Sequence, residues 1–275
     1  MEWNEYEVNY DEIPKELLVL VEEQNNCIIS TCEKNWEEAF VNLLGYVDVT
    51  SAELVREGGR LIWPVNNQSE AFDKFKSQTI YRVKARQWTG KGPTTGGLFD
   101  SHSEDEFYVV DVLLENESEP RLEEILQEYR KPVIVKDEVL GTLTLNKQCS
   151  CFEGQMQWQD TLVKLTLEVN NFNNATGTRK RNAMKKFVEK LDYWEKDMKE
   201  YAARGLLELA KEWQEEDMEG IEQQAIYDRI AIQHIVMTSS GSFMVYFDDD
   251  DIFAGHTIIV CGTMKSGVRS AEIVG

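Results

Sequence analysis

The residues of this sequence with the clearest chemical potential are four consecutive aspartates, Asp248, Asp249, Asp250 and Asp251, followed closely by His256. Carboxylates and an imidazole this close together can bind a hard divalent cation or transfer protons. However, Asp also suits turn geometry, and successive side chains of an extended segment point in opposite directions, so four carboxylates converge poorly. We favour a polar, solvated turn between two strands, with a cation-binding or acid–base site as the alternative.

A second acidic segment extends from residue 208 to residue 222. Its acidic residues are Glu208, Glu212, Glu215, Glu216, Asp217, Glu219 and Glu222, and Lys211 is its only basic residue. Such a segment is either the solvated end of a helix or a contact surface for a basic protein. We take Glu212, Glu215, Glu216 and Glu219 as the candidate contact residues.

Other groups give weaker signals. Arg82, Lys84 and Arg86 share one side of an alternating segment, where they could hold an anion or pair with neighbouring acidic residues. Cys149 and Cys151 lack the two-residue gap of zinc and redox motifs. The sequence has no P-loop, G-x-G-x-x-G, H-E-x-x-H or G-x-S-x-G motif. We therefore assign no catalytic residue and no cofactor, and the sequence leaves metal binding open.

The charge balance restricts the partners. The 275 residues include 29 Lys and Arg against 50 Asp and Glu, a net charge of −21. Phosphate contacts need clustered basic residues, so we expect neither nucleic acid nor an anionic membrane surface as a partner. A basic protein is the partner that this charge would attract, although solubility alone also accounts for an acidic chain. Nothing in the sequence indicates an oligomeric state.

The sequence also favours a cytoplasmic location. No apolar run approaches the ~20 residues of a membrane-spanning helix. The acidic first residues lack the basic and then apolar pattern of a secretory signal. We accordingly expect the five cysteines to be reduced thiols.

The elements that would position these groups follow from spacing. We expect helices over residues 14–24, 35–44, 52–57 and 120–130, and strands over residues 60–65, 79–88, 107–114 and 131–135. After a junction at Asp137-Glu138 we expect strands over residues 139–145, 151–158 and 161–169, helices over residues 178–213 and 221–230, and strands over residues 234–237, 242–247, 256–261 and 268–274. We expect a break in the long helix near Gly205.

This order predicts an α+β protein of two domains. The C-terminal domain, residues 137–275, should contain a mostly antiparallel sheet with inserted helices. Residues 1–136 should form a smaller α+β domain.

The C-terminal half resembles an uncharacterised bacterial family, domain of unknown function 2262. The matching segments are Leu140-Gly-Thr-Leu-Thr-Leu145, Phe152-Glu-Gly154 with Trp158, Ser240-Gly-Ser-Phe243, Tyr246-Phe-Asp-Asp249, Asp251-Ile-Phe253, Gly255-His-Thr-Ile-Ile259, and Ala271-Glu-Ile273 with Gly275. Residues 1–136 resemble the extension that often precedes this family. The resemblance implies a sheet with inserted helices, and it brings no catalytic residues. Its layout is similar to that of acidic proteins found beside bacterial toxin genes, some of which act as immunity proteins.

Two functional hypotheses follow, beside a third, a scaffold in a larger assembly. The first is an acidic interaction protein that binds a basic partner, in its concrete form a bacterial immunity protein that neutralises it. The alternative is an enzyme or ligand-binding protein that uses Asp248–Asp251 and His256, with or without a divalent cation. Convergence of these groups in a concave pocket would favour the alternative.

Overall fold

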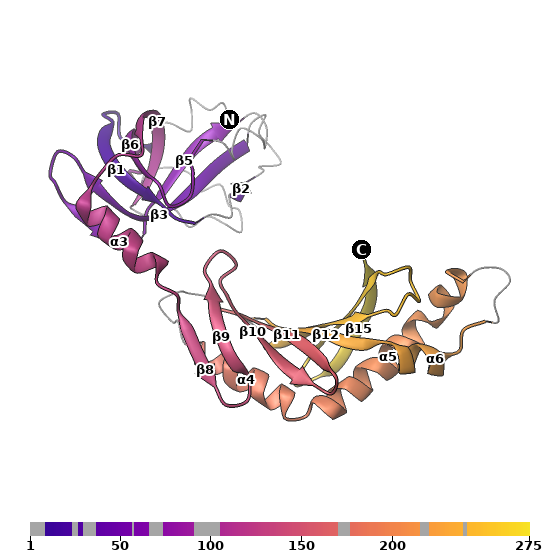
Figure 1. Ribbon diagram of the computed structural model, residues 1–275. Coiled ribbons are helices and arrows are strands. Elements are labelled where there is room, and N and C mark those ends of the chain that lie inside the picture. Colours follow the sequence, from indigo (N-terminus) through magenta and orange to yellow (C-terminus); the bar gives the residue numbers. More distant parts are fainter. Residues whose placement is uncertain are drawn as a thin grey trace. The chain divides into compact units, whose positions relative to one another are not determined.

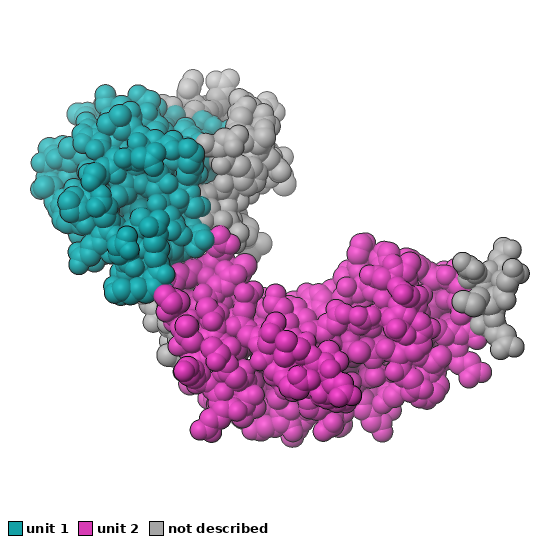
Figure 2. Space-filling view, in the orientation of Figure 1, with its two compact units in different colours: residues 1–131 teal, residues 132–275 magenta. Residues whose placement is uncertain are grey.

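The computed structural model describes residues 9–23, 27–29, 37–56, 58–65, 74–90, 105–169, 177–214, 220–238 and 241–275. The chain divides into two compact units, Met1–Lys131 and Pro132–Gly275, which are coloured separately in Figure 2. The division precedes the junction expected at Asp137-Glu138. Strands predominate over helices in the described residues, so the protein is a sheet-rich α+β protein.

The N-terminal unit contains a closed β-barrel and one described helix (Figure 1). Its elements are β1 (Lys15–Val21), β2 (Cys27–Ile29), β3 (Glu37–Asp48), β4 (Leu54–Arg56), β5 (Arg60–Val65), β6 (Ile80–Gln87), β7 (Glu106–Glu115) and α3 (Pro120–Arg130). Strands β1, β6, β7, β5 and β3 pair in that order, and β3 pairs again with β1 to close the barrel. Four of these five pairings are antiparallel, and β5 with β7 is parallel. This is the Greek-key strand order of OB-type barrels, an architecture that hosts unrelated functions.

The helices expected over residues 14–24, 35–44 and 52–57 are wrong, because these regions contain β1, β3 and β4. The cause is clearest in β1, whose apolar residues follow one another without a break. Alternate residues of β1 point into the barrel, while Leu18 and Leu20 pack with residues of α3. A strand that is buried on both faces shows no alternation of apolar and polar residues, so periodicity does not distinguish it from a buried helix.

In its described residues, the C-terminal unit is one eight-stranded sheet with three helices, whose arrangement Figure 1 shows. Its strands are β8 (Ile134–Asp137), β9 (Gly141–Asn146), β10 (Cys151–Trp158), β11 (Thr161–Glu168), β12 (Ala231–Met237), β13 (Ser242–Asp248), β14 (Thr257–Thr263) and β15 (Gly267–Val274), and its helices are α4 (Thr178–Val188), α5 (Leu191–Glu212) and α6 (Gln223–Arg229). The strands pair in sequence order. All pairings are antiparallel except β11 with β12, between which the helices are inserted. This agrees with the expected sheet with inserted helices.

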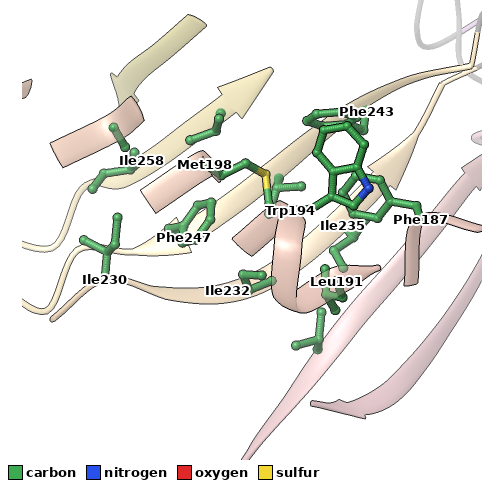
Figure 3. Close-up of a cluster of buried hydrophobic side chains, with 14 of the residues drawn as sticks. Phe187, Leu191, Trp194, Met198, Ile230, Ile232, Ile235, Phe243, Phe247 and Ile258 are labelled. Atoms are coloured by element: carbon green, nitrogen blue, oxygen red, sulfur yellow. The ribbon is translucent and has the colours of Figure 1, made fainter. Parts of the chain in front are cut away.

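The core of this unit lies between α4, α5 and one face of the sheet (Figure 3). Leu191, Trp194 and Met198 follow one another at three- and four-residue intervals along α5, so they share the face that is buried. Trp194 stacks on Phe187 of α4 with ring centroids 5.5 Å apart, and both rings contact Phe243 of β13. These contacts fix α5 against the centre of the sheet.

The expected break near Gly205 is wrong, because α5 continues through this residue. Gly205 is exposed, and a side chain at this position would meet no neighbouring atom within 4 Å. A single glycine costs a helix about 1 kcal/mol relative to alanine, which the packing of the opposite face can offset. None of the helices in the described ranges has the length and apolar character that crossing a membrane requires.

Candidate functional site

The acidic turn connects β13 to β14, and Asp249 organises it. Only 2% of Asp249 is exposed. Its carboxylate accepts hydrogen bonds from the backbone N–H groups of Asp251 at 3.3 Å, Phe253 at 2.6 Å and Gly255 at 3.3 Å. A solvated turn therefore describes the neighbouring aspartates but not Asp249, which satisfies backbone donors that the turn leaves without strand partners.

The other three aspartates are exposed and have separate surroundings. The carboxylate of Asp248 accepts a hydrogen bond from the backbone N–H of Asp250 at 2.8 Å. It accepts another from the side-chain amide of Gln233. Asp250 binds the guanidinium of Arg229 at 2.7 Å, and the same group also donates to the Asp250 carbonyl. Asp250 and Asp251 have φ of +47° and +60°, a left-handed conformation that Asp tolerates better than most residues.

His256 is fixed at the end of the same turn. Its Nδ1 lies 2.7 Å from the carbonyl oxygen of Phe253, and because a carbonyl only accepts, Nδ1 carries the proton and donates. Its ring meets the ring of Trp213 edge to face, with centroids 5.0 Å apart. One ring nitrogen is therefore committed to a structural bond, and the contact with Trp213 limits the movement of the ring.

These groups line one hollow on the surface. Asp248–Asp251 and His256, together with Gln233, Gly255 and Thr257, surround a cavity of about 360 Å³. The structure thus brings the whole predicted turn site together. Within the described ranges, however, no three His, Cys, Asp or Glu side chains are placed to hold one metal ion. The hollow can offer separate hydrogen-bond acceptors to a small polar molecule.

The second acidic segment begins on α5. Glu208 and Glu212 are exposed in its last turns, whereas Glu215, Glu216 and Glu219 lie outside the described residues. Trp213 follows α5 directly and remains 43% exposed although its ring contacts both His256 and Phe253. The side chain of Trp213 therefore links the two acidic segments that the sequence presented as separate candidates.

Two further contacts complete this end of the unit. The side-chain oxygen of Gln214, just beyond α5, accepts from the backbone N–H of Ile221 at 2.8 Å. Helix α6 then ends at Arg229, which binds Asp250. We call this region the acidic end; its exposed carboxylates within the described residues are Glu208, Glu212, Glu222, Asp228, Asp248, Asp250 and Asp251. In the sequence, the one signal for this convergence was Trp213, a large aromatic residue inside the acidic segment 208–222.

The basic strand and the two cysteines, which were the weaker candidates, lie apart from this region in sequence and have their own surroundings. Arg82 pairs with Glu16 and Glu117, each at 2.9 Å, so this member of the basic strand already has acidic neighbours. Cys149 lies in a turn and is exposed, while Cys151 begins β10 and is buried. Both of these cysteines and Cys261 are free thiols. Cys32 and the side chain of Cys27 lie outside the described residues.

Comparison with protein families gives the class of the chain. Residues 137–273 match the family described as "Uncharacterized protein conserved in bacteria (DUF2262)", which confirms the resemblance found in the C-terminal half. Residues 2–129 match a separate model, "Domain of unknown function (DUF7021)", so the expected extension is a domain family of its own. No curated protein and no solved structure matches the chain.

Proposed function

We propose that this protein is an acidic interaction module whose acidic end binds a basic protein. The observation that carries the proposal is the position of Trp213, which is half-exposed between the carboxylates of α5 and those of the β13–β14 turn. Between residues 204 and 251 the sequence has twelve acidic residues and three basic ones, a net charge of −9. An apolar anchor within a negative rim fits a partner that presents an apolar pocket among Lys and Arg residues.

The roles of the two components differ. Trp is among the residue types that contribute most to protein interfaces, particularly where surrounding groups exclude water. The contacts with His256 and Phe253 restrict the Trp213 ring before binding, which reduces the entropy lost on association. The carboxylates chiefly accelerate encounter with a basic partner, since their field acts over the distance that salt allows.

In its concrete form, the protein is a bacterial immunity protein that neutralises a basic toxin. The similarity in layout to acidic proteins found beside toxin genes supports this form, together with the net charge of −21. The mechanism needs no chemistry from the module, because occupation of a basic functional surface would block the toxin.

The test begins with capture of partners from the native host, followed by measurement of association and dissociation rates for each purified partner. A basic partner should associate more slowly as salt rises, while its dissociation rate changes less. Glu208→Lys with Glu212→Lys should slow association at least tenfold, and Trp213→Ala should weaken affinity about 30-fold through faster dissociation.

The matched control is Glu138→Lys with Asp160→Lys, which reverses two exposed carboxylates elsewhere in the unit. It makes the same change in net charge and should alter the rates less than threefold. Recovery of only acidic or neutral partners, or equal effects of the two double variants, would reject the proposal.

The hollow supports a second candidate function, the binding of a small polar ligand, because it is lined by all four aspartates and His256. Its metal-dependent form requires the carboxylates to move closer together, since no three of the described groups are placed to hold one ion. Titration with Mg²⁺, Ca²⁺ or Mn²⁺ while monitoring backbone amide resonances would test it. Shifts confined to residues 248–257 that disappear in Asp250→Asn would favour this candidate over the interaction module. Unchanged resonances at millimolar metal would remove its metal-dependent form.

A further inference from the structure

The C-terminal unit also has a strongly basic region, which the charge of the whole chain conceals. Between residues 178 and 190 there are six Lys or Arg residues and one acidic residue, Glu189, a net charge of +5 in a chain of −21. Five of the six are on α4, and the sixth, Lys190, lies in the turn before α5. We call this region the basic end.

The stability of α4 does not account for these charges. Three cations, Arg179, Lys180 and Arg181, follow Thr178 in the first turn, and the helix has no acidic residue there. The N-cap residue, Gly177, supplies no side-chain hydrogen bond. The positive end of a helix dipole disfavours cations by roughly 0.3–1 kcal/mol each, so α4 is less stable with these side chains than with neutral ones.

One buried carboxylate engages the inner side of this helix. The side chain of Asp137 is 2% exposed and lies 2.7 Å from Lys185 Nζ and 3.9 Å from Arg181. The outer side is different. Arg179 and Lys186 are exposed and seven residues apart, which places them on one face of α4, and Lys190 is exposed just beyond it. The basic end therefore presents cations to the surroundings as well as to its own fold.

The two charged ends lie at opposite ends of one helix. Helix α5 has 22 residues and is about 33 Å long. An exposed aromatic side chain is present at each end: Tyr193, 61% exposed, beside the basic end and Trp213, 43% exposed, in the acidic end. Each end thus combines an aromatic contact residue with the charge that the other end lacks.

We propose that the basic end of one molecule binds the acidic end of a second copy of this chain, head to tail. The net charge opposes the approach of two molecules, but screening limits this repulsion to about 8 Å at physiological ionic strength, so the charges in contact decide. The interface joins two different surfaces, which leaves one free basic end and one free acidic end on every dimer. The association can therefore extend to longer oligomers.

This inference does not depend on the proposed basic partner, but both use the acidic end. Self-association would consequently compete with partner binding, and a basic partner would dissociate the oligomers. Sedimentation velocity at increasing protein concentration separates the two ideas, because it needs no partner.

The decisive experiment uses two complementary variants of the full chain. Arg179→Glu with Lys186→Glu changes the net charge of residues 178–190 from +5 to +1, and Glu208→Lys with Glu212→Lys changes that of residues 204–251 from −9 to −5, so each variant keeps one native end. Each variant alone should remain monomeric, whereas their mixture should form dimers of 1:1 composition, because only one native pair of ends is left. The wild type should form larger species whose average mass falls at least twofold between 50 and 500 mM NaCl.

The control Glu138→Lys with Asp160→Lys should associate like the wild type, and circular dichroism of each variant checks that it folds. If a reversal prevents folding, the milder pair Arg179→Gln with Lys186→Gln replaces it and should reduce wild-type association at least fivefold. A wild type that stays monomeric up to 1 mM at 50 mM NaCl overturns the inference, as does a mixture that remains monomeric. Neither result bears on binding of a basic partner.

Discussion

The ring of Trp213 lies 5.0 Å from the ring of His256, with the two planes at 81°. Residue 213 directly follows α5, and His256 ends the turn between β13 and β14. This edge-to-face contact joins the C-terminal end of the longest described helix to the acidic turn between β13 and β14. The end of the helix and the turn should consequently be coupled in stability as well as in position.

Replacement of Trp213 by Ala tests this coupling. The change removes the contacts with His256 and Phe253, and for a half-buried aromatic ring we expect the free energy of unfolding to fall by about 1–2 kcal/mol. Trp213→Phe should recover most of the loss. Tyr193→Ala, at the other end of α5, is the control and should cost less, because Tyr193 is 61% exposed. Equal losses for Tyr193 and Trp213 in urea denaturation would disprove the coupling.

Asp249 should be more important for stability than its three exposed neighbours. Asp249→Ala leaves three backbone N–H groups without their carboxylate acceptor, and we expect a loss of about 2–4 kcal/mol. Asp249→Asn keeps one acceptor oxygen and should lose less. Asp160→Asn, in an exposed turn, should change stability by less than about 0.5 kcal/mol. Faster amide hydrogen exchange at Phe253 and Gly255 in Asp249→Ala would locate the effect; an unaffected turn would contradict it.

Asp137 should anchor α4 to the start of the sheet. Burial acts to raise the pKa of its carboxyl, but the bond from Lys185 and the backbone N–H groups of Val139 and Leu140 hold the pKa below its ordinary value. Asp137→Asn should lower the free energy of unfolding by about 1–3 kcal/mol near neutral pH.

The loss should diminish in acid. A depressed pKa contributes stability that is complete above the unfolded pKa, near 4, and disappears as pH falls through the folded value. Glu138→Gln, which alters the exposed neighbouring carboxylate, is the control. The prediction fails if the difference between Asp137→Asn and the wild type is the same at pH 3 as at pH 7.

His234 should make the fold less stable in mild acid. Its Nε2 lies 2.8 Å from Thr166 Oγ1 and its ring stacks on Tyr246. Partial burial and the nearby Lys164 lower the pKa of His234, while Glu153 acts in the opposite direction. The folded protein therefore binds this proton less readily than the unfolded chain, so its contribution is present above pH 6.5 and is lost as the pH falls below that value.

The many carboxylates of the chain also affect its stability in acid, so the contribution of His234 has to be measured as a difference between the wild type and a variant. The free energy of unfolding of the wild type and of His234→Gln should converge as the pH is lowered from 7.5 to 5. His102 lies outside the described residues, and His256→Gln serves as the matched imidazole control. A gap between the wild type and His234→Gln that widens in acid would show that the pKa shift has the opposite sign.

The two cysteines around the start of β10 should differ in reactivity. Burial, with the negative charge of Glu153 and the neighbouring Cys149, raises the pKa of Cys151 to about 11. The thiolate is the reactive form, so at pH 8 iodoacetamide should modify exposed Cys149 at least tenfold faster than Cys151 in the folded protein. Mass spectrometry of peptides gives both rates, and urea should abolish the difference. Faster modification of Cys151 would show that β10 opens locally.

The sequence was sufficient where residues alternate or recur at helical spacing. The strands around Tyr246 and Ile259 and the helix face that carries Trp194 and Met198 follow directly from these periods. The barrel was missed because the strand from Leu17 to Val21 is buried on both faces, so its sequence shows no alternation of apolar and polar residues. The prediction of two domains and of inserted helices used less local information, namely the succession of strands and helices along the chain.

The candidate site was predicted in its residues but not in its arrangement. Asp248–Asp251 and His256, which the sequence groups by proximity along the chain, all line one hollow. The burial of Asp249 depends on three backbone donors that exist only after the turn forms. The approach of Trp213 to the turn depends on the length and direction of α5, which spacing within a short segment does not contain.

The parallel pairing of β11 with β12 has a consequence for how the chain acquires its structure. The two strands are adjacent in the sheet, yet residues 169–230 separate them. On either side, β8–β11 and β12–β15 are runs of sequence neighbours whose pairings need only short loops. The seam between the two runs requires closure of a long segment that contains three helices, and contacts of this separation form slowly. During synthesis, β11 is complete long before β12 exists, and its unpaired edge can pair with other chains. The rate at which α4 and α5 collapse onto β10 and β11 therefore decides how long a nascent chain remains prone to aggregation.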